Sequence, residues 1–378
     1  MKPIMKLSLL LIAILFLCEC KKEPKSVDFP DVNLLNAIIK QGYDTDHNGS
    51  ISNDEAAAVT FLNISNSRVS GMHGIEFLVN LKSLDCSQNQ IMHLDLSGNT
   101  QLETLNCYAN QLVSLDVTNC KKLKSLICTT NHLPELDVSN NAQLTELQCM
   151  SNEFTSIDLT QNLELEVLLV GVPGLNGLDI SRNIGLKRLE CSGANLKSLD
   201  VSKNTLLYQL GCNYNHLTNI DVSNNIALIF LACAYNDLTG LDVSKNTILE
   251  LLDCSHNNFA SLDISKNPSL YYLGCSDNQL TNIDLSKNNG LKILYCGSNN
   301  FSNLDLTKNT AMNLLDCGSN KLISLNLIQN TALNILNINF MPSLNKVCVL
   351  TLPFPPDGIQ VNKENSPNVS FSTICNNK

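Results

Sequence analysis

One spacing constrains this chain more than any other feature of its sequence: cysteine returns every 21 residues. The cysteines of this series occupy positions 86, 107, 128, 149, 191, 212, 233, 254, 275, 296 and 317, and the one skipped position is Val170. Leu or Met stands five residues before each of them and Leu two before, and Asn follows three residues after all except Cys191. A unit this short cannot bury an apolar face alone, so neighbouring units must stack into a repeat solenoid.

Each unit contains the pattern of a short strand with one buried face. Leu84 and Cys86 alternate with polar residues, as their equivalents do in later units, and this period of two indicates a strand. We expect the strands of successive units to lie parallel, with Leu and Cys in columns inside the solenoid. Asn89 and its equivalents stand where the chain leaves the strand, and we expect their amides to satisfy backbone groups of neighbouring coils.

The frame L-x-x-L-x-C-x-x-N-x-L resembles the leucine-rich repeat, with Cys in its third apolar position, over about three quarters of the chain. The first unit, from Leu62 to Leu81, resembles the repeats of internalin-type surface proteins. The resemblance implies an α/β repeat solenoid: a leucine-rich-repeat horseshoe or arc with short parallel strands on its concave face. A small helical N-terminal cap and an irregular C-terminal cap would close its two ends.

A row of Asp residues marks the other half of each unit. Leu or Ile precedes Asp, as in Leu94–Asp95 and Leu115–Asp116, and Ser or Thr follows two residues later. Short acceptors at this spacing close turns by accepting hydrogen bonds from nearby N–H groups. The alternative is a calcium array or an acidic catalytic face. Because every repeat carries the Asp whereas catalysis needs a singular site, we favour the structural role.

The cysteine series has three interpretations: metal ligands, disulfides, or small apolar groups in a core. Zinc sites use pairs of Cys two to four residues apart, which this series lacks. Coils about 4.8 Å apart bring Cα atoms into disulfide range, yet parallel Cβ atoms do not converge to the roughly 3.8 Å that a disulfide needs. We therefore predict a core column of buried, protonated thiols. Cys120 replaces an expected turn Asn and is assigned no function.

Two further cysteines, Cys348 and Cys375, follow the point where the repeat frame ends and proline becomes frequent. In an exported protein, two such cysteines are best interpreted as a disulfide. It would stabilise the fold by about 3–4 kcal/mol on the chain-entropy account. Two free thiols are the alternative.

One motif before the first repeat has the chemistry of a metal site. The segment from Asp44 to Glu55 fits the EF-hand pattern D-x-[DN]-x-[DN]-G-x5-E at every required position, and its Gly49 would allow the sharp turn. Calcium takes six to eight oxygen ligands. The predicted ligands are Asp44, Asp46, Asn48, Ser50, Ser52 and Glu55. Residues 32–41 and 54–61 are expected to form flanking helices. We predict one structural Ca²⁺ that orders the cap; a solvated acidic turn is the alternative.

The first twenty residues have the pattern of a signal. Two lysines precede an apolar run, from Leu7 to Leu17, that is too short for a membrane span of about 20 residues but suits secretion. A Cys at its end resembles a bacterial lipoprotein signal, with Cys18 or Cys20 lipidated; a plain secretion signal is the alternative. This signal, the calcium loop and the Cys-containing repeats together resemble leucine-rich-repeat surface lipoproteins of Gram-negative bacteria. The resemblance implies export to the outer membrane or cell surface.

An apolar strip is the face on which we expect binding. Three residues before each cysteine, the outward strand position is polar in early units, as at Ser83 and Thr104, and mostly apolar in later ones. The predicted binding residues on the concave face are Phe230, Leu251, Tyr272, Ile293, Tyr295 and Leu314. Such a strip suits contact with a protein or a glycan. Incidental exposure, or coverage by the C-terminal tail, is the alternative.

These features divide the chain into five parts. They are 1–20 (lipoprotein-type signal), 21–28 (linker), 29–61 (helical cap with the EF-hand-like loop), 62–345 (about 14 coils) and 346–378 (C-terminal cap). No other segment is expected to span a membrane, so the lipid would be the single membrane anchor.

Charge and composition narrow the function. The net charge is −10, and no Lys/Arg cluster occurs beyond the N-terminus, so nucleic acid is not an expected partner. The six His form no grouping typical of a catalytic site. We expect a non-enzymatic recognition or adhesion protein with a protein or glycan ligand. An accessory protein or enzyme of polysaccharide processing, or a purely structural envelope lipoprotein, is the alternative.

Overall fold

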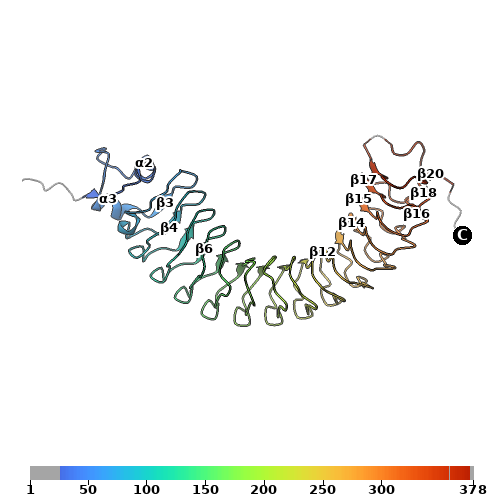
Figure 1. The fold of residues 1–378 in the computed structure, drawn as a ribbon, viewed down its shortest axis with the longest axis horizontal. Helices are drawn as coiled ribbons and strands as arrows, with labels where there is room; N and C mark the ends of the chain where they lie inside the picture. The colour runs from blue at the N-terminus through green and yellow to red at the C-terminus, as the bar shows by residue number, and fades with distance from the viewer. Residues whose placement is uncertain (1–25, 357, 375–378) are drawn as a thin grey trace, which may run out of the picture.

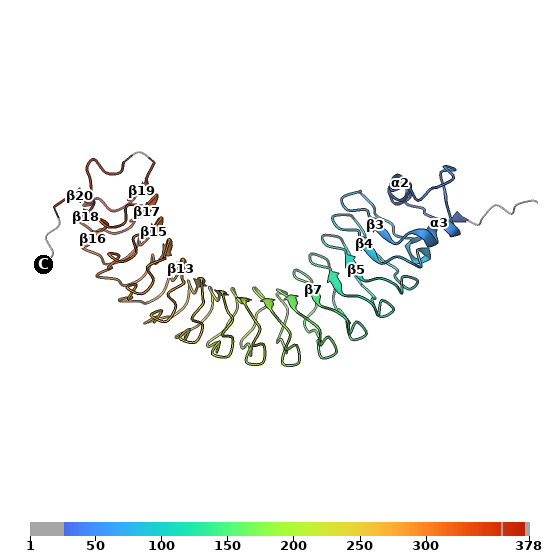
Figure 2. The same ribbon diagram turned by 180° about the vertical axis from the view of Figure 1, so that it is seen from behind.

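The chain forms one continuous arc of stacked coils (Figure 1). The computed structural model describes residues 26–356 and 358–374. Short strands line the concave side of the arc, and the returning segments and turns form its convex side, as the opposite view also shows (Figure 2). The predicted leucine-rich-repeat arc is therefore confirmed. Among the described residues, no helix has the length and apolar character needed to cross a membrane.

The concave side is a single parallel sheet of 15 strands among the described residues. Its strands are β3 (Phe61–Asn63), β4 (Ser83–Asp85), β5 (Thr104–Asn106), β6 (Ser125–Ile127), β7 (Glu146–Gln148), β8 (Val167–Leu169), β9 (Arg188–Glu190), β10 (Gln209–Gly211), β11 (Phe230–Ala232), β12 (Leu251–Asp253), β13 (Tyr272–Gly274), β14 (Ile293–Tyr295), β15 (Leu314–Asp316), β17 (Ile335–Asn337) and β19 (Gln360–Asn362). From β4 to β17 partner residues stand 21 apart, as in the pair Leu210 and Leu231. The repeat length thus sets the register directly.

The core runs through the solenoid as columns of equivalent side chains. In β4 to β15, except at β8 where Val170 replaces Cys, the middle Leu and the Cys two residues later point inward, and each Cys of the 21-residue series is 0 % exposed. All of these cysteines carry free thiols. The core column of thiols predicted from the spacing is therefore present in the structure.

The Asn that follows each strand bridges neighbouring coils. The side-chain N–H of Asn110 donates to the carbonyl oxygens of Cys86 and Cys107, at 2.9 and 3.2 Å. Its Oδ1 accepts from the backbone N–H of Ile91 at 3.0 Å. Because these backbone groups are buried, the amide replaces the water that they would otherwise need.

A second row of buried amides lies at the turn on the other side of each coil. Asn141 shows the pattern: its side-chain N–H donates to the carbonyl oxygens of Val117 and Cys120, at 3.0 and 2.9 Å. Cys120 occupies this row itself and lies 3.8 Å from the carbonyl oxygen of Asn99. Burial raises the pKa of its thiol to about 11. Cys120 is thus a structural replacement for Asn.

A small cap closes the N-terminal end. It contains β1 (Ser26–Val27), α2 (Val32–Lys40), β2 (Ile51–Ser52) and α3 (Asn53–Ala58), with a 3₁₀ turn, η1 (Ile75–Phe77), in the first coil. Leu34 and Ile38 of α2 are buried in the core of this end. The predicted first helix is confirmed. The helix predicted for 54–61 is shorter, because Val59 is extended and Phe61 already belongs to the sheet.

The C-terminal end is more regular than predicted. A second parallel sheet joins β16 (Ser324–Asn326), β18 (Lys346–Cys348) and β20 (Ser370–Ser372) on the outer side (Figures 1 and 2). The described residues of the range 346–378, which was expected to be irregular, therefore contain three strands. Partners here stand 22, 24 and 25 residues apart, so the coils persist although the 21-residue frame is lost. Cys348 is disulfide-bonded. Because Cys375 lies outside the described residues, its pairing with Cys348 stays a prediction.

Candidate functional site

The loop between α2 and α3 brings three carboxylates together. Oxygen atoms of Asp44, Asp46 and Glu55 lie within 4.8 Å of one another. Asp44 and Glu55 are buried, whereas Asp46 is exposed. Gly49, with φ 78°, has the left-handed conformation that favours glycine. Its backbone N–H donates to Oδ2 of Asp44 at 3.0 Å. The loop is therefore folded around its own carboxylates.

Hydrogen bonds orient Glu55 at the end of this loop. Its Oε2 accepts from the backbone N–H of Ser52 at 2.9 Å, and its Oε1 accepts from that of Thr45 at 2.6 Å. The bond from Ser52 contributes most to lowering the pKa of Glu55 to about 2. The Ser52 hydroxyl in turn accepts from the backbone N–H of Glu55, which completes a capping box at the start of α3. Glu55 is thus held ionised at neutral pH.

The donor chemistry of the loop fits calcium. Converging carboxylates supply the hard oxygen ligands that Ca²⁺ prefers. Asn48 and Ser50 lie in the same turn, where the Ser50 N–H donates to Oδ1 of Asn48 at 2.8 Å. Ile51 is buried and pairs with Val27 of β1, which anchors the loop from outside. The structure brings together the predicted acidic ligands, and bound calcium stays a prediction.

Strands β11 to β15 carry the predicted binding strip in one register. Its members are Phe230, Leu251, Tyr272, Ile293 and Leu314. Each is half-buried, because outward side chains on strands about 4.8 Å apart cover one another. Tyr295, at the second outward position of β14, has its ring centroid 5.9 Å from that of Tyr272. The six predicted residues therefore form one continuous surface, which we call the concave strip.

Within the described residues, the C-terminal segment extends the concave sheet and does not fold back over the strip. Gln360 of β19 pairs with Ile335 of β17, at the end of the arc (Figure 2). Carboxylates lie along the strip, because Asp253 and Asp316 end strands β12 and β15. Burial first, and then the charge of Asp253, raise the pKa of Tyr272 to about 12. The strip combines apolar area with negative charge.

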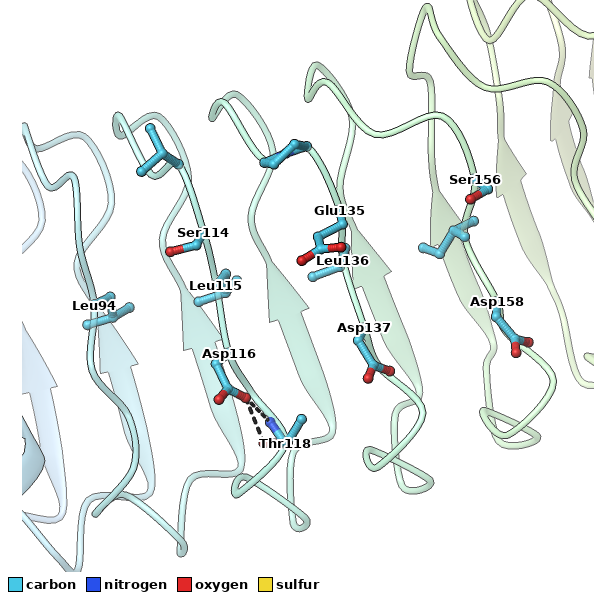
Figure 3. A pocket seen from close by; sticks show the side chains of 13 residues that line it. Leu94, Ser114, Leu115, Asp116, Thr118, Glu135, Leu136, Asp137, Ser156 and Asp158 are labelled. Atoms are coloured by element: carbon cyan, nitrogen blue, oxygen red, sulfur yellow. Dashed lines mark hydrogen bonds between the residues drawn. The ribbon is translucent and has the colours of Figure 1, made fainter.

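The row of Asp residues on the convex side has the structural role predicted for it. In Figure 3, Asp116 accepts hydrogen bonds from the backbone N–H of Thr118 at 2.9 Å and from its hydroxyl at 2.7 Å. These bonds lower the pKa of the Asp116 carboxyl. A shallow groove of about 670 Å³ is lined by residues of four coils here, from Leu94 to Asp158. Its carboxylates repeat from coil to coil, so it presents no singular site.

The cysteine column offers no reactive centre within the described part of the chain. Its thiols are fully buried. Burial raises the pKa values of Cys212 and Cys275 to about 12, so these thiols are protonated at neutral pH. Catalysis by a thiolate therefore has no support.

One arrangement was not predicted from the sequence. The rings of Tyr214 and Tyr235 stack with centroids 4.2 Å apart, and Tyr235 stacks on His256 at 3.8 Å. Each of these residues stands two positions after a cysteine of the series. That common offset is the signal that would have revealed the stack.

Comparison with known proteins agrees with this architecture. The functional domain of InlJ from Listeria monocytogenes, which includes a cysteine ladder, superposes with a TM-score of 0.80 and 35% sequence identity. The match covers 86% of this chain and 77% of that domain. In sequence, 72 residues are 39% identical to Internalin J of Listeria monocytogenes serotype 4b; they are 19% of this chain and span only 8% of that protein.

A more distant structure shares the fold alone. The leucine-rich-repeat ectodomain of the plant receptor kinase GASSHO1/SCHENGEN3 from Arabidopsis thaliana has 20% identity and a TM-score of 0.62. That match covers 74% of this chain and 40% of the other. No protein-family profile matches the chain. On the extent and identity of the match to the InlJ domain, together with the shared cysteine ladder, this chain belongs to the internalin-type leucine-rich-repeat proteins.

Proposed function

We propose that this protein is a non-enzymatic surface recognition or adhesion protein that binds a protein or glycan through its concave strip. The observation that carries the proposal is the continuous register of apolar side chains from Phe230 to Leu314 on the inner sheet. Early coils place polar residues such as Ser83 and Thr104 at the same position. Folding therefore does not require apolar groups there, whereas ligand binding would explain why the later coils carry them.

Ligand-bound relatives of the same fold support a protein partner. The plant ectodomain described above is in complex with CASPARIAN STRIP INTEGRITY FACTOR 2. Large apolar and aromatic side chains at the centre of an interface carry most of its binding energy. Tyr272 and Ile293 occupy the middle of the concave strip, on neighbouring strands. They are the residues that we expect to contribute most.

The test compares matched pairs of variants. Tyr272→Ala and Ile293→Ala should abolish capture of a ligand from envelope, host or glycan fractions, while Ser83→Ala and Thr104→Ala, at the same strand position, should retain it. Thermal unfolding of every variant shows whether the fold survives. Equal capture by both pairs, or turnover of a glycan or peptide by the purified protein, would contradict the proposal.

We further propose a structural Ca²⁺ in the N-terminal cap. The carboxylates of Asp44, Asp46 and Glu55 would hold it, with oxygens of Asn48, Ser50 and Ser52. Calcium should raise the midpoint of thermal unfolding, since a ligand that binds only the folded state stabilises it. Glu55→Gln should remove that gain. Asp54→Asn is the control, because it removes an equal charge from the exposed first turn of α3. Isothermal titration without heat at millimolar calcium would contradict this site.

The last element of the proposal is location at the cell surface through a lipid anchor. Its support is the signal-like N-terminus and the resemblance to internalin-type surface proteins. Cys18 and Cys20 lie outside the described residues, so mass spectrometry of the mature N-terminus is the test. A diacylated or triacylated Cys at either position supports an outer-membrane or cell-surface lipoprotein of a Gram-negative bacterium. An unmodified mature terminus would contradict it.

A further inference from the structure

A short aromatic column runs along one edge of the concave side. Tyr214, Tyr235 and His256 stack face to face across three coils, with interplanar angles of 13° and 16°. Tyr214 is 61% exposed and Tyr235 is 41% exposed. Equivalent positions in several other coils, such as Thr130 and Ser151, hold small or polar residues with the same positive φ, although Phe340 occupies one near the C-terminal end. The fold therefore does not require aromatic rings here, and their joint exposure calls for another explanation.

The column has one open end. Tyr235 covers one face of the Tyr214 ring, and the coil on the other side presents Gly193 at the equivalent position. A Cβ atom added to Gly193 would meet nothing within 4 Å. The face of the Tyr214 ring that is turned away from Tyr235 therefore borders an open space, one coil high, which we call the step. Coils repeat about every 4.8 Å, which is the height that one further planar group needs.

One carboxylate lies near this step, on the strand that also carries Arg188, and a second lies at the far end of the column. Glu190 ends strand β9 on the side of Gly193, and its Oε1 accepts from the backbone N–H of Ser192 at 3.1 Å. At the far end of the column, Asp277 lies 3.4 Å from His256. Partial burial, the Tyr214 hydroxyl and the carboxylates of Asp277 and Asp253 all raise the pKa of Tyr235. The negative field thus reaches the rings.

We infer that the open face of Tyr214, above Gly193 and beside Glu190, binds the guanidinium of an arginine in a basic segment of the protein ligand. A guanidinium is planar, stacks on aromatic faces and pairs with carboxylates, and cation–π contacts to Tyr favour it. A net charge of −10 on the chain attracts a basic segment from a distance. Arginine and tyrosine are also enriched where protein interfaces bind most tightly. This inference rests on the proposed function in taking the ligand to be a protein.

The test measures, by NMR, the binding of the capped peptide Gly-Gly-Arg-Gly-Gly to the full mature chain. The arginine side-chain protons should shift upfield on binding, because they lie over an aromatic ring. A peptide with citrulline, which has the same shape without the charge, should bind at least tenfold more weakly. Tyr214→Ala should weaken the arginine peptide by a similar factor. Glu190→Gln should weaken it several-fold.

A blocking variant separates the site from general loss of structure. Gly193→Tyr should continue the column and abolish peptide binding with an unchanged unfolding midpoint, since Tyr214 and Tyr235 already adopt a similar φ. Thr130→Tyr, at the same turn position in a distant coil, should leave binding intact. Equal affinity for the arginine and citrulline peptides, undiminished binding by Gly193→Tyr, or ring shifts caused by a monosaccharide but not by the peptide would each overturn the inference. Tyr272→Ala should not affect the peptide, so failure of the concave strip and failure of this site are distinguishable.

Discussion

Asn236→Ala tests the role of the buried amides in holding neighbouring coils together. The Oδ1 of Asn236 accepts from the backbone N–H of Leu217 at 3.0 Å, and its amide donates to the carbonyl oxygens of Cys212 and Cys233. Those two carbonyl oxygens keep their bonds from the Asn residues of the adjacent coils. The Leu217 N–H loses its partner entirely. An orphaned buried donor costs about 1–3 kcal/mol, and the lost bonds to carbonyls add about 1 kcal/mol.

We therefore expect Asn236→Ala to lower the free energy of unfolding by about 2–4 kcal/mol. Urea denaturation measures that loss, and hydrogen exchange at the Leu217 amide shows whether it is local. Asn258→Ala is the matched control: Asn258 is exposed, so its loss should be within about 0.5 kcal/mol. If the two variants lose the same stability, or if the Leu217 amide stays protected from hydrogen exchange, the reasoning about the buried Asn row is wrong.

The chain contains a natural version of this substitution. Ala194 stands where the buried Asn of the other coils would be. An Asn at this position would accept a hydrogen bond from the backbone N–H of Leu175. In the structure, the Leu175 N–H donates instead to the carbonyl oxygen of Val172 at 3.0 Å. This local turn supplies the acceptor that Ala194 lacks. Loss of one buried Asn amide is thus tolerated where a local turn supplies another acceptor for the backbone N–H. The loop that contains Leu217 has no such turn.

Four further outcomes are expected. Cys254→Ser should lower the free energy of unfolding by about 1–3 kcal/mol, measured by urea denaturation, because a hydroxyl would enter an apolar column. Iodoacetamide should label the cysteines of the 21-residue series only after unfolding, since burial keeps their thiols protonated. Glu55 has its pKa lowered from 4.5 to about 2, so the stability it contributes should be present above about pH 4.5 and lost as the pH falls toward 2, a dependence that Glu55→Gln should flatten in thermal scans. Tyr272→Ala should cost about 1–2 kcal/mol of stability, because its side chain is half-buried; a loss of 4 kcal/mol would show a core residue.

The regular part of the fold was predictable because one period controls it. Once Leu84 and Cys86 are assigned to the inner face, the 21-residue repeat places the concave strands from β5 to β17, and the structure has them there. Strands at 346, 360 and 370 escaped prediction because their coils are 22 to 25 residues long, so the period no longer marks them. A sequence period reveals only coils of constant length, whereas strands can pair by hydrogen bonds across coils of different lengths.

The candidate sites were predictable to different extents. The acidic loop follows a pattern of consecutive residues, so Asp44, Asp46 and Glu55 could be placed together from the sequence. Its pairing partner, Ser26–Val27, could not, because a two-residue strand carries no pattern of its own. The exposure of the concave strip also depends on neighbours: an outward residue on a central strand is covered on both sides, which is why Tyr272 is half-buried.

Variation between coils locates function in a repeat protein, because every coil meets the same structural demands. Inward positions hardly change from coil to coil, and where Ala194 replaces the buried Asn a local turn supplies the missing acceptor. The outward positions are free of those demands, so selection on them acts through what they contact. Both unusual surfaces, the concave strip and the column from Tyr214 to His256, lie after the skipped position at Val170. They share coils β11 and β12, so one ligand that spans these coils would contact apolar strip, aromatic column and carboxylates together.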